Sequence, residues 1–360
     1  MKFIITAGGQ GTKLWPYSRA DKPKHFQNIL EGESLFGYNA KILLDRYKPE
    51  DIFVSTKKRY LKFIKEQAPR IPEENYVVEP DIRKNRGPAE GLAFLILSMR
   101  HPDEPFIIVQ ADCVRSPEEK YLEFIETAEK LAKKDKKFIT GGIKAITPVL
   151  GVDFLKVGDA VKGDFKCDVF EINEYVNRMS DYEETKSLVE NFNITTHCNH
   201  NCWYPDLMLE AYKKYHPSWY KDLMRMKDVI GTKNGEKEIE KIYSEMDSGP
   251  TEEVTKYVFP EGYVIIVPYK WSDIGTWNSL HEYFAKEGEN YEEGKVLALD
   301  SNNNIIKSDQ DGKLLATYGI ENLVIVDMKD VLLVIPKDKI DKIKDIQKAL
   351  EEKKDLNKFL

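Results

Sequence analysis

Short apolar runs alternate with longer amphipathic segments over the first part of the chain, up to about Leu150. The short runs predict strands at KFIITA from Lys2, DIFVST from Asp51, NYVVEP from Asn75, PFIIVQAD from Pro105 and KKFITGGI from Lys136. Apolar residues at a period of about 3.6 predict helices over Ser34–Tyr47, Lys57–Gln67, Gly87–Met99 and Pro117–Lys134. This repetition of strand and helix is typical of an α/β domain with a largely parallel sheet.

The pattern changes after this first part. From Gly151 to Trp203 the apolar runs become strand-like, and helices resume at Asp206 and at Glu238 before a predicted strand from Tyr263 to Val267. We expect this stretch to form a subdomain that faces a substrate. After Phe284, short apolar runs separated by Asn, Asp and Gly follow at roughly ten-residue spacing and predict a small β domain.

The last segment, from Lys337 to Leu356, predicts an amphipathic helix with one highly charged face. Its apolar face carries Ile340, Ile343, Ile346 and Leu350. Such a helix would pack on the β domain and leave its charges in solvent. Because a chain of 360 residues suits two domains, we predict a larger domain over residues 1–288 and a smaller one over residues 289–360.

Charge and composition narrow the possible partners. The chain has 61 Asp and Glu against 54 Lys and Arg, and this formal charge of -7 argues against a nucleic-acid or anionic-membrane surface. No uninterrupted apolar stretch is long enough to span a bilayer, and the first residues resemble a strand rather than a signal peptide. We therefore expect a cytoplasmic protein, in which its four Cys would be reduced thiols.

A glycine-rich segment, AGGQGTKLWPYSRADKPKHF from Ala7 to Phe26, directly follows the first predicted strand. The backbone N–H groups of such a turn can surround a phosphate, and its spacing matches neither the P-loop nor the dinucleotide-binding fingerprint. The glycines are Gly8, Gly9 and Gly11, and the cations that follow are Lys13, Arg19, Lys22 and Lys24. These cations would neutralise a triphosphate, and a plain solvated turn is the alternative.

Two Asp residues are candidates for holding a metal ion. Asp112 follows the apolar run PFIIVQA, at the end of a predicted strand where open α/β sheets bind their ligands. Asp273, in KWSDIGTW, precedes a predicted helix. Taken alone, Asp112 would serve equally well as a turn residue and Asp273 as a helix N-cap.

The glycine-rich segment resembles a known family signature. GGQGTKLWP, followed by SR and PK, is similar to the GGxGTRLWP, SR and PK signature of mannose-1-phosphate guanylyltransferases. The resemblance assigns triphosphate binding to Gly8, Gly9, Gly11, Thr12, Lys13, Arg19 and Lys24, and it makes Lys13 and Lys24 catalytic candidates. Lys13 stands where the family has Arg, which keeps the charge but loses the planar bidentate geometry.

The likeness continues at four further places. EPDIRKNRGPA resembles the EPxxRNTAPA segment that lies near the base, which assigns nucleotide contacts to Glu79, Asn85, Pro88 and Ala89. QADC and KWSDIGTW resemble the PADH and GWSDIGSW motifs, whose Asp residues hold the metal. Asp112 and Asp273 are therefore expected to bind Mg²⁺ or another divalent ion and to act in catalysis, with Asp112 also near the nucleotide. The C-terminal strands resemble the β-helical tail of the same enzymes.

The resemblance is weaker in the sugar pocket. The family contacts its sugar phosphate through a TGYGYI stretch, an EKP turn and an NAG or NSG strand, which assigns sugar contacts to Gly151, Glu174 and Asn199. Departures stand beside them: Asp153 for a Gly, Tyr175 for the phosphate-binding Lys, and His200 and Asn201 for two small residues. A zinc site is a further, weaker alternative, formed by His197, Cys198, His200 and Cys202, although their spacing fits no common zinc pattern.

Together these features predict a Rossmann-like α/β nucleotidyltransferase domain of the GT-A type, with a mixed, mostly parallel sheet, and a small C-terminal β-helix-like domain. The resemblance implies metal-dependent transfer from GTP to mannose 1-phosphate or a related hexose or heptose 1-phosphate. The attacking phosphate is already an anion, so metal and cationic groups rather than a general base would carry the chemistry. A catalytically silent regulatory subunit and a different base or sugar are the alternatives. By analogy, the chain could form a homodimer.

Overall fold

The computed structural model describes residues 1–9, 11–30 and 32–360, and these form two compact units. The first unit comprises Met1–Gly8, Ala40–Gln110 and Arg115–Lys270. The second comprises Gly9–Asn39, Ala111–Val114 and Trp271–Leu360. The second unit therefore joins most of the glycine-rich segment to the C-terminal strands, which are far away in the sequence.

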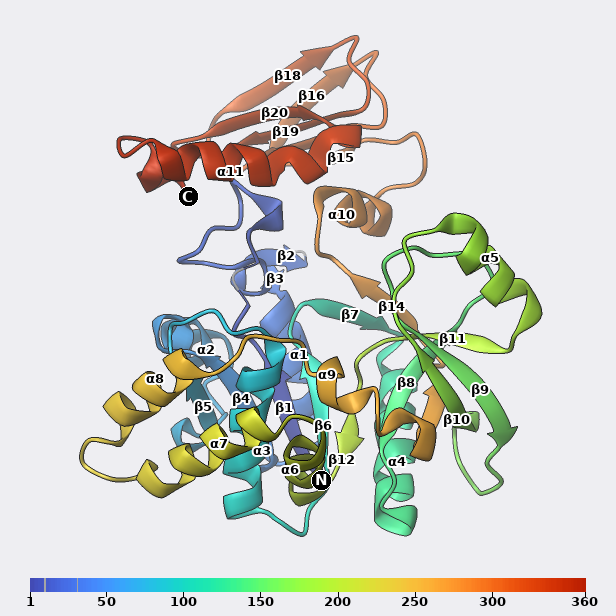
Figure 1. Cartoon of the computed structure of the whole chain (residues 1–360). Coiled ribbons are helices and arrows are strands. Elements are labelled where there is room, and N and C mark those ends of the chain that lie inside the picture. The colour runs from blue at the N-terminus through green and yellow to red at the C-terminus, as the bar shows by residue number, and fades with distance from the viewer. Residues whose placement is uncertain (10, 31) are drawn as a thin grey trace. The chain divides into compact units, whose positions relative to one another are not determined.

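A ten-stranded mixed sheet forms the centre of the first unit (Figure 1). Its order is β11-β9-β10-β13-β8-β12-β6-β1-β4-β5. The strands are β1 (Lys2–Thr6), β4 (Ile52–Lys57), β5 (Tyr76–Glu79), β6 (Phe106–Gln110), β8 (Ile139–Lys144), β9 (Phe154–Ala160), β10 (Val169–Val176), β11 (Ile194–His197), β12 (Cys202–Trp203) and β13 (Tyr263–Ile266). Strands β6, β1, β4 and β5 are parallel neighbours, as are β8 and β13, whereas the other pairs in this sheet are antiparallel.

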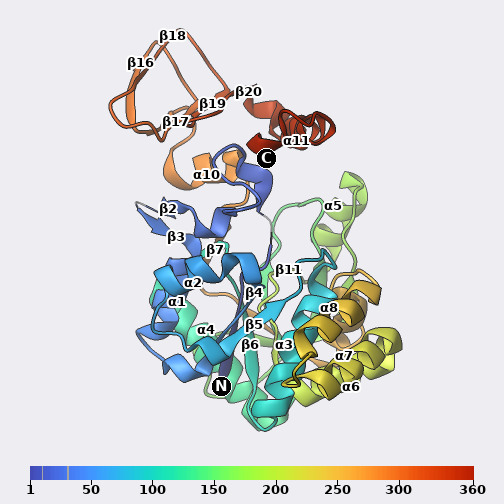
Figure 2. The same cartoon turned by 90° about the vertical axis from the view of Figure 1, so that its left-hand side faces the viewer.

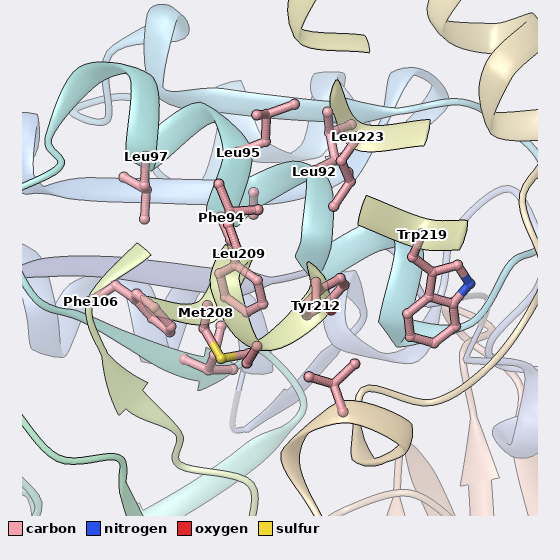
Figure 3. Packing of buried hydrophobic residues seen from close by; sticks show 14 of the residues in the cluster. Leu92, Phe94, Leu95, Leu97, Phe106, Met208, Leu209, Tyr212, Trp219 and Leu223 are labelled. Atoms are coloured by element: carbon pink, nitrogen blue, oxygen red, sulfur yellow. The ribbon is translucent and has the colours of Figure 1, made fainter. Parts of the chain in front are cut away.

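Helices complete the core of this unit. They are α2 (Leu61–Gln67), α3 (Arg86–Arg100), α4 (Glu118–Asp135), α5 (Tyr182–Asn191), α6 (Pro205–Tyr215), α7 (Pro217–Val229), α8 (Gly235–Glu245) and α9 (Glu252–Thr255), while α1 (Leu35–Leu44) spans the boundary between the units. Side chains of α3, α6 and α7 point toward one another, with Phe94 beside Leu209 and Trp219 near Tyr212 (Figure 3). The apolar period of α3 places Leu92, Phe94 and Leu95 in this core.

The second unit contains the C-terminal strands. These are β15 (Tyr291–Glu293), β16 (Lys295–Leu299), β17 (Ile305–Ser308), β18 (Leu314–Tyr318), β19 (Leu323–Asp327) and β20 (Leu332–Pro336). Parallel pairing joins β16 to β18, and β17 to both β15 and β19, so the chain winds as a coil, seen nearly end on in Figure 2. Strand β20 closes one side in antiparallel pairing with β19. This arrangement confirms the predicted β-helix-like fold.

Shorter elements flank this coil. They are η1 (Thr12–Leu14), η2 (Lys24–Phe26), β2 (Asn28–Leu30), β3 (Glu33–Ser34), α10 (Trp277–Phe284) and α11 (Ile343–Glu352). Two more strands, β7 (Cys113–Ser116) and β14 (Lys270–Asp273), pair with each other. A second core joins residues near the N-terminus to residues of the C-terminal strands and helix. It includes Leu14, Trp15, Ile305, Val324 and Ile343. The same-face spacing of Ile340 and Ile343 explains why the C-terminal segment packs there.

The predicted strands and helices of the first part are confirmed, although α1 and α2 are shorter than expected. Three helices of the described residues were missed, α5, α7 and the four-residue α9. Helix α5 buries only Thr185 and Leu188, so its apolar period is weak. Helix α7 buries Trp219, Leu223 and Met226, a helical spacing that was readable. The described residues form no helix with both the length and the apolar character needed to cross a membrane.

Candidate functional site

The glycine-rich segment begins where β1 ends, in the first unit. The Ala7 N–H donates to the Ser55 carbonyl at 2.8 Å, which extends the sheet to the edge of the turn. A Cβ atom at Gly8 would stand 2.0 Å from Oε1 of Glu79, at the end of β5. A larger residue at this point would therefore displace the Glu79 carboxyl, and the structure brings Gly8 and Glu79 together as two predicted nucleotide-binding residues.

Glu79 is a buried carboxyl, with 6% of its surface exposed. The Tyr243 hydroxyl donates to its Oε2 at 2.9 Å. Burial raises the pKa of Glu79 to about 7, and Asp81 adds to this shift, whereas Lys57 and Tyr243 oppose it. Glu79 thus titrates near neutral pH directly beside the glycine turn.

The segment continues in the second unit. Gly9 is exposed, and Gly11 adopts a φ of 50°, in the left-handed region that glycine favours. The short helix Thr12–Leu14 follows, and its Lys13 side chain is exposed. The Lys24 N–H donates to the Gly11 carbonyl at 3.4 Å, so this part of the segment folds back on itself and places Lys24 beside Gly11.

Lys24 bridges the two predicted metal ligands, all three residues lying in the second unit. Its Nζ lies 2.9 Å from Oδ2 of Asp112 and 3.0 Å from Oδ1 of Asp273. The Lys24 side chain is only 8% exposed, whereas the Asp112 and Asp273 side chains are 35% and 50% exposed. Two carboxylates distant in the sequence therefore converge on one cationic position and remain open to solvent.

The charges of this triad stabilise one another. Burial opposes ionisation of Asp112, but the adjacent Lys24 ammonium outweighs burial and holds the pKa of Asp112 at about 2. Burial likewise lowers the pKa of Lys24, yet Asp112 and Asp273 together raise it above its ordinary value. At neutral pH Asp112 is therefore a carboxylate and Lys24 an ammonium ion.

Local structure decides the alternatives for the two Asp residues. The cap of α10 is Thr276, whose hydroxyl accepts a hydrogen bond from the Ser279 N–H in a capping box. The N-cap interpretation of Asp273 is therefore wrong, because this residue ends strand β14 instead. Asp112 does lie in the short turn between β6 and β7, as the second alternative stated, and its carboxylate also bonds Lys24.

Asp112 and Asp273 fit a hard divalent cation. Their oxygens already approach one positive charge from two sides, and Mg²⁺ in nucleotide sites is held by one or two carboxylates together with phosphates and water. Within the described ranges, no group of three or more His, Cys, Asp or Glu side chains is placed to hold a metal ion. The protein itself would thus supply two carboxylates and leave the other positions to substrate oxygens and water.

Arg19 is engaged in a structural ion pair. Its Nη1 and Nη2 donate to the two carboxylate oxygens of Asp330 at 2.9 and 2.5 Å, and its Nε donates to the Pro16 carbonyl at 3.2 Å. Asp330 lies between β19 and β20, so Arg19 ties the loop to the C-terminal strands. A phosphate contact by Arg19 stays a prediction, and the bidentate pair shows a second role that sequence reasoning missed.

The predicted base-side residues lie at the start of α3, in the first unit. Asn85 caps this helix by accepting a hydrogen bond from the Arg86 N–H at 2.8 Å. Pro88 is buried and Ala89 is half-buried in its first turns. Arg86, which replaces a family Thr, forms an ion pair with Glu252. The departure from the family thus introduces a partly buried charge pair beside this segment.

The three predicted sugar contacts come from separate turns and strands of the first unit. Gly151 adopts a φ of 74° in the turn before β9. Glu174, on β10, is exposed and pairs with Lys156 of β9 at 2.6 Å. Asn199 adopts a φ of 56° between β11 and β12. Their sugar-binding roles stay predictions, since nothing in this geometry is specific to a sugar.

The departures near Glu174 have clear structural roles. Tyr175, where the family has Lys, stacks on Phe259 with ring centroids 5.2 Å apart. Asp153 is buried and accepts hydrogen bonds from the backbone N–H and the guanidinium of Arg178. Sequence reasoning missed Arg178, which lies three residues after Tyr175. The Arg178 guanidinium is a cation near Tyr175, the residue that stands where the family has its phosphate-binding Lys.

The histidine and cysteine cluster forms a core network. His200 is buried, and its Nδ1 lies 2.7 Å from the Cys198 carbonyl while its Nε2 accepts from Nε of Arg115 at 2.9 Å. Strand β11 ends at His197 and β12 begins at Cys202, so no single strand presents these side chains on one face. Both ring nitrogens of His200 are therefore used within the protein.

Comparisons with known proteins agree with this architecture. A "Nucleotidyl transferase" family model matches residues 2–149, and a "MannoseP isomerase/GMP-like beta-helix domain" model matches residues 294–350. The mannose-1-phosphate guanylyltransferase of Salmonella muenchen is 28% identical, over 99% of this chain and 76% of that protein. The alginate biosynthesis protein AlgA of Pseudomonas syringae pv. tomato is 26% identical, over 97% of this chain and 71% of that protein.

A solved structure shows the same fold over almost the whole chain. The crystal structure of mannose-1-phosphate geranyltransferase from Thermus thermophilus superposes with a TM-score of 0.82 at 21% identity, and it covers 97% of this chain and 99% of that chain. These comparisons confirm the predicted fold class, an α/β nucleotidyltransferase domain followed by β-helix-like strands.

Proposed function

We propose that this chain, which belongs to the nucleotidyl transferase family as a relative of the mannose-1-phosphate guanylyltransferases, transfers a guanylyl group from GTP to mannose 1-phosphate or a related hexose or heptose 1-phosphate. The observation that carries the proposal is the bridge from Lys24 to Asp112 and Asp273, formed beside the glycine-rich segment. Nucleotidyl transfer depends on positive charge held beside the phosphates, which this bridge and a metal ion on the two carboxylates would supply.

In this reaction a sugar phosphate oxygen attacks the α-phosphorus of GTP. A new P–O bond forms, the bond to the β-phosphate bridging oxygen breaks, and pyrophosphate departs with its charge. Asp112 and Asp273 would hold Mg²⁺, which when bound supplies positive charge to the phosphate oxygens. Lys24 would add a fixed ammonium, and the backbone of the segment containing Gly9 and Gly11 would donate N–H groups to phosphate.

The remaining contacts are assigned by family likeness. Glu79, Asn85, Pro88 and Ala89 would lie on the side of the base, with Thr12, Lys13 and Arg19 on the side of the triphosphate. The sugar would contact Gly151, Glu174 and Asn199. The departures at Asp153 and Tyr175 make the sugar pocket the part most open to a substrate other than mannose 1-phosphate.

The experiment is a direct assay of pyrophosphate release. The protein is incubated with Mg²⁺, GTP and a panel of hexose and heptose 1-phosphates, with ATP, UTP and dTTP as alternative nucleotides. We expect turnover with GTP and at least one sugar 1-phosphate. No pyrophosphate from any combination would refute the proposal.

A catalytically silent regulatory subunit is the second candidate. It is favoured by Tyr175, whose ring stacks on Phe259 at the position of the family's phosphate-binding Lys. Such a protein would bind a GDP-sugar tightly without turnover and would change the activity of a partner enzyme. Because Lys24 brings Asp112 and Asp273 together as a candidate metal site, we rank this candidate below the enzyme.

A further inference from the structure

The residues after the glycines are held by the C-terminal end of the same unit. The Trp15 indole N–H donates to the Phe359 carbonyl at 2.7 Å. The Trp277 indole N–H in turn donates to the Trp15 carbonyl at 3.2 Å. Leu14 and Trp15 also pack in the apolar core that contains Ile343 of α11. The path of the loop is therefore fixed by residues that come far later in the chain.

One contact acts on the backbone of the loop itself. The side-chain amide of Gln347, on α11, donates to the Thr12 carbonyl at 3.1 Å. The same carbonyl accepts the Trp15 N–H at 3.1 Å, so both of its lone pairs are used. Because Ile343 lies one helical turn before Gln347 and is buried, the helix holds this amide in a defined position.

The direction of this hydrogen bond has a consequence for the next N–H group. In a trans peptide the carbonyl of one residue and the N–H of the next point in opposite directions. By drawing the Thr12 carbonyl toward α11, Gln347 directs the Lys13 N–H away from α11. An N–H group in this turn is one of those available to a phosphate.

We propose that Gln347 is a positioning residue for nucleotide binding, through which the C-terminal helix sets the conformation of the Thr12–Leu14 turn. This inference rests on the proposed function for the identity of the nucleotide. The contact is made by a side chain outside the glycine-rich segment and both metal-ligand motifs. Helix α11 then contributes to the nucleotide site, although it lies far from the glycine-rich segment in the sequence.

The test compares Gln347→Ala and Gln347→Glu with Lys348→Ala, which changes an exposed residue of the same helix. Titration with Mg·GTP should show affinity about two- to tenfold lower for Gln347→Ala, as expected for one lost hydrogen bond. Gln347→Glu should bind more weakly still, because its carboxylate opposes the Thr12 carbonyl. The KM for GTP should rise with a smaller change in kcat, and Lys348→Ala should match the unsubstituted protein.

Amide hydrogen exchange of the nucleotide-free protein gives a second readout. Both Gln347 variants should exchange faster over residues 11–15, with unchanged exchange in the strands β17 and β19. Exchange and GTP affinity equal to those of Lys348→Ala would overturn the inference, as would a general loss of protection throughout the unit. If the unsubstituted protein bound no nucleotide, the proposed function would fail. Exchange over residues 11–15 would still show whether Gln347 sets the conformation of the Thr12–Leu14 turn.

Discussion

At the scale of single residues, Lys24 sets the charge arrangement of the site. Its buried ammonium lies within 3.0 Å of both Asp112 and Asp273, which would otherwise repel each other. A lysine held in this way maintains two carboxylates in position before any ligand arrives. It also competes with a metal ion for the same oxygens.

Replacing Asp112 or Asp273 by Ala should abolish turnover. Each variant removes one of the two carboxylates that would hold the cation, and we expect pyrophosphate release to fall by about a hundredfold or more. Both side chains are partly exposed, so circular dichroism and the thermal midpoint should change little. Near-normal turnover in either variant would show that the metal assignment is wrong.

Replacing Lys24 by Met should separate metal binding from catalysis. Without the competing ammonium, the two carboxylates should bind Mn²⁺ about tenfold more tightly in the nucleotide-free protein, as judged by calorimetric titration. Turnover with Mg·GTP should nevertheless fall, because a cation beside the phosphates is lost. Lys348→Met, which removes an exposed charge, is the matched control; equal Mn²⁺ affinity in both variants would refute the competition.

Glu79 should make stability depend on pH. The folded carboxyl has a pKa of about 7 against an ordinary value of 4.5, so the unfolded chain releases its proton first as pH rises. The free energy of unfolding therefore falls between about pH 4.5 and pH 7, and the penalty is constant above that range. Glu79→Gln should raise the free energy of unfolding at about pH 8, by up to about 3 kcal/mol, with little effect near pH 4.5.

Urea denaturation at both pH values measures this effect. A Glu79→Gln variant whose stability tracked that of the unsubstituted protein at every pH would contradict the raised pKa. Because the Gln side chain keeps the shape of Glu79 beside Gly8, a new steric clash is not expected to obscure the result.

At the scale of elements, the crossing of α3 and α7 depends on one small residue. A Cβ atom at Gly87 would stand 2.2 Å from the Trp219 ring and 2.8 Å from the Gly249 carbonyl oxygen. The Tyr212 hydroxyl also donates to the Gly87 carbonyl at 2.8 Å. Three helices therefore approach one another at a point where no side chain fits.

Gly87→Ala should destabilise the first unit by about 1–3 kcal/mol, because overpacking displaces the Trp219 ring or the backbone near it. Chemical denaturation monitored by tryptophan fluorescence would measure the loss. Met99→Ala, at an exposed position of the same helix, should change stability by much less. Equal effects of the two substitutions would show that this crossing tolerates additional volume.

At the scale of the whole molecule, the glycine-rich segment and the C-terminal strands share one core. Leu14 and Trp15 pack with Ile305, Val324 and Ile343, although residues 9–39 lie far from residues 271–360 in the sequence. The domain boundary predicted at residue 288 separates these partners. The cytoplasmic location and the homodimer stay predictions.

A fragment of residues 1–288 should therefore fold poorly. It would expose the apolar faces of Leu14 and Trp15 that the C-terminal strands cover, and exposed apolar surface of this kind promotes aggregation. We expect low yield of dispersed protein and strong binding of a hydrophobic dye relative to the full chain. A cooperative, monomeric fragment with native stability would show that residues 1–288 form an independent domain.

The sequence by itself determined most of the strands and helices before Leu150, since short apolar runs and a period of about 3.6 are local properties of the chain. It also indicated the likeness to the mannose-1-phosphate guanylyltransferases, because the loop and both Asp motifs are contiguous strings. Helix α5 was missed because only its Thr185 and Leu188 are buried, so its apolar period is weak.

Only the tertiary structure decided which distant residues meet. Lys24 lies between Asp112 and Asp273, Arg19 is tied to Asp330, and Gln347 holds the Thr12 carbonyl. These contacts join positions up to 335 residues apart, and no periodic pattern specifies such pairs. Packing of the whole chain brings them together, and with them the charge and backbone geometry of the site.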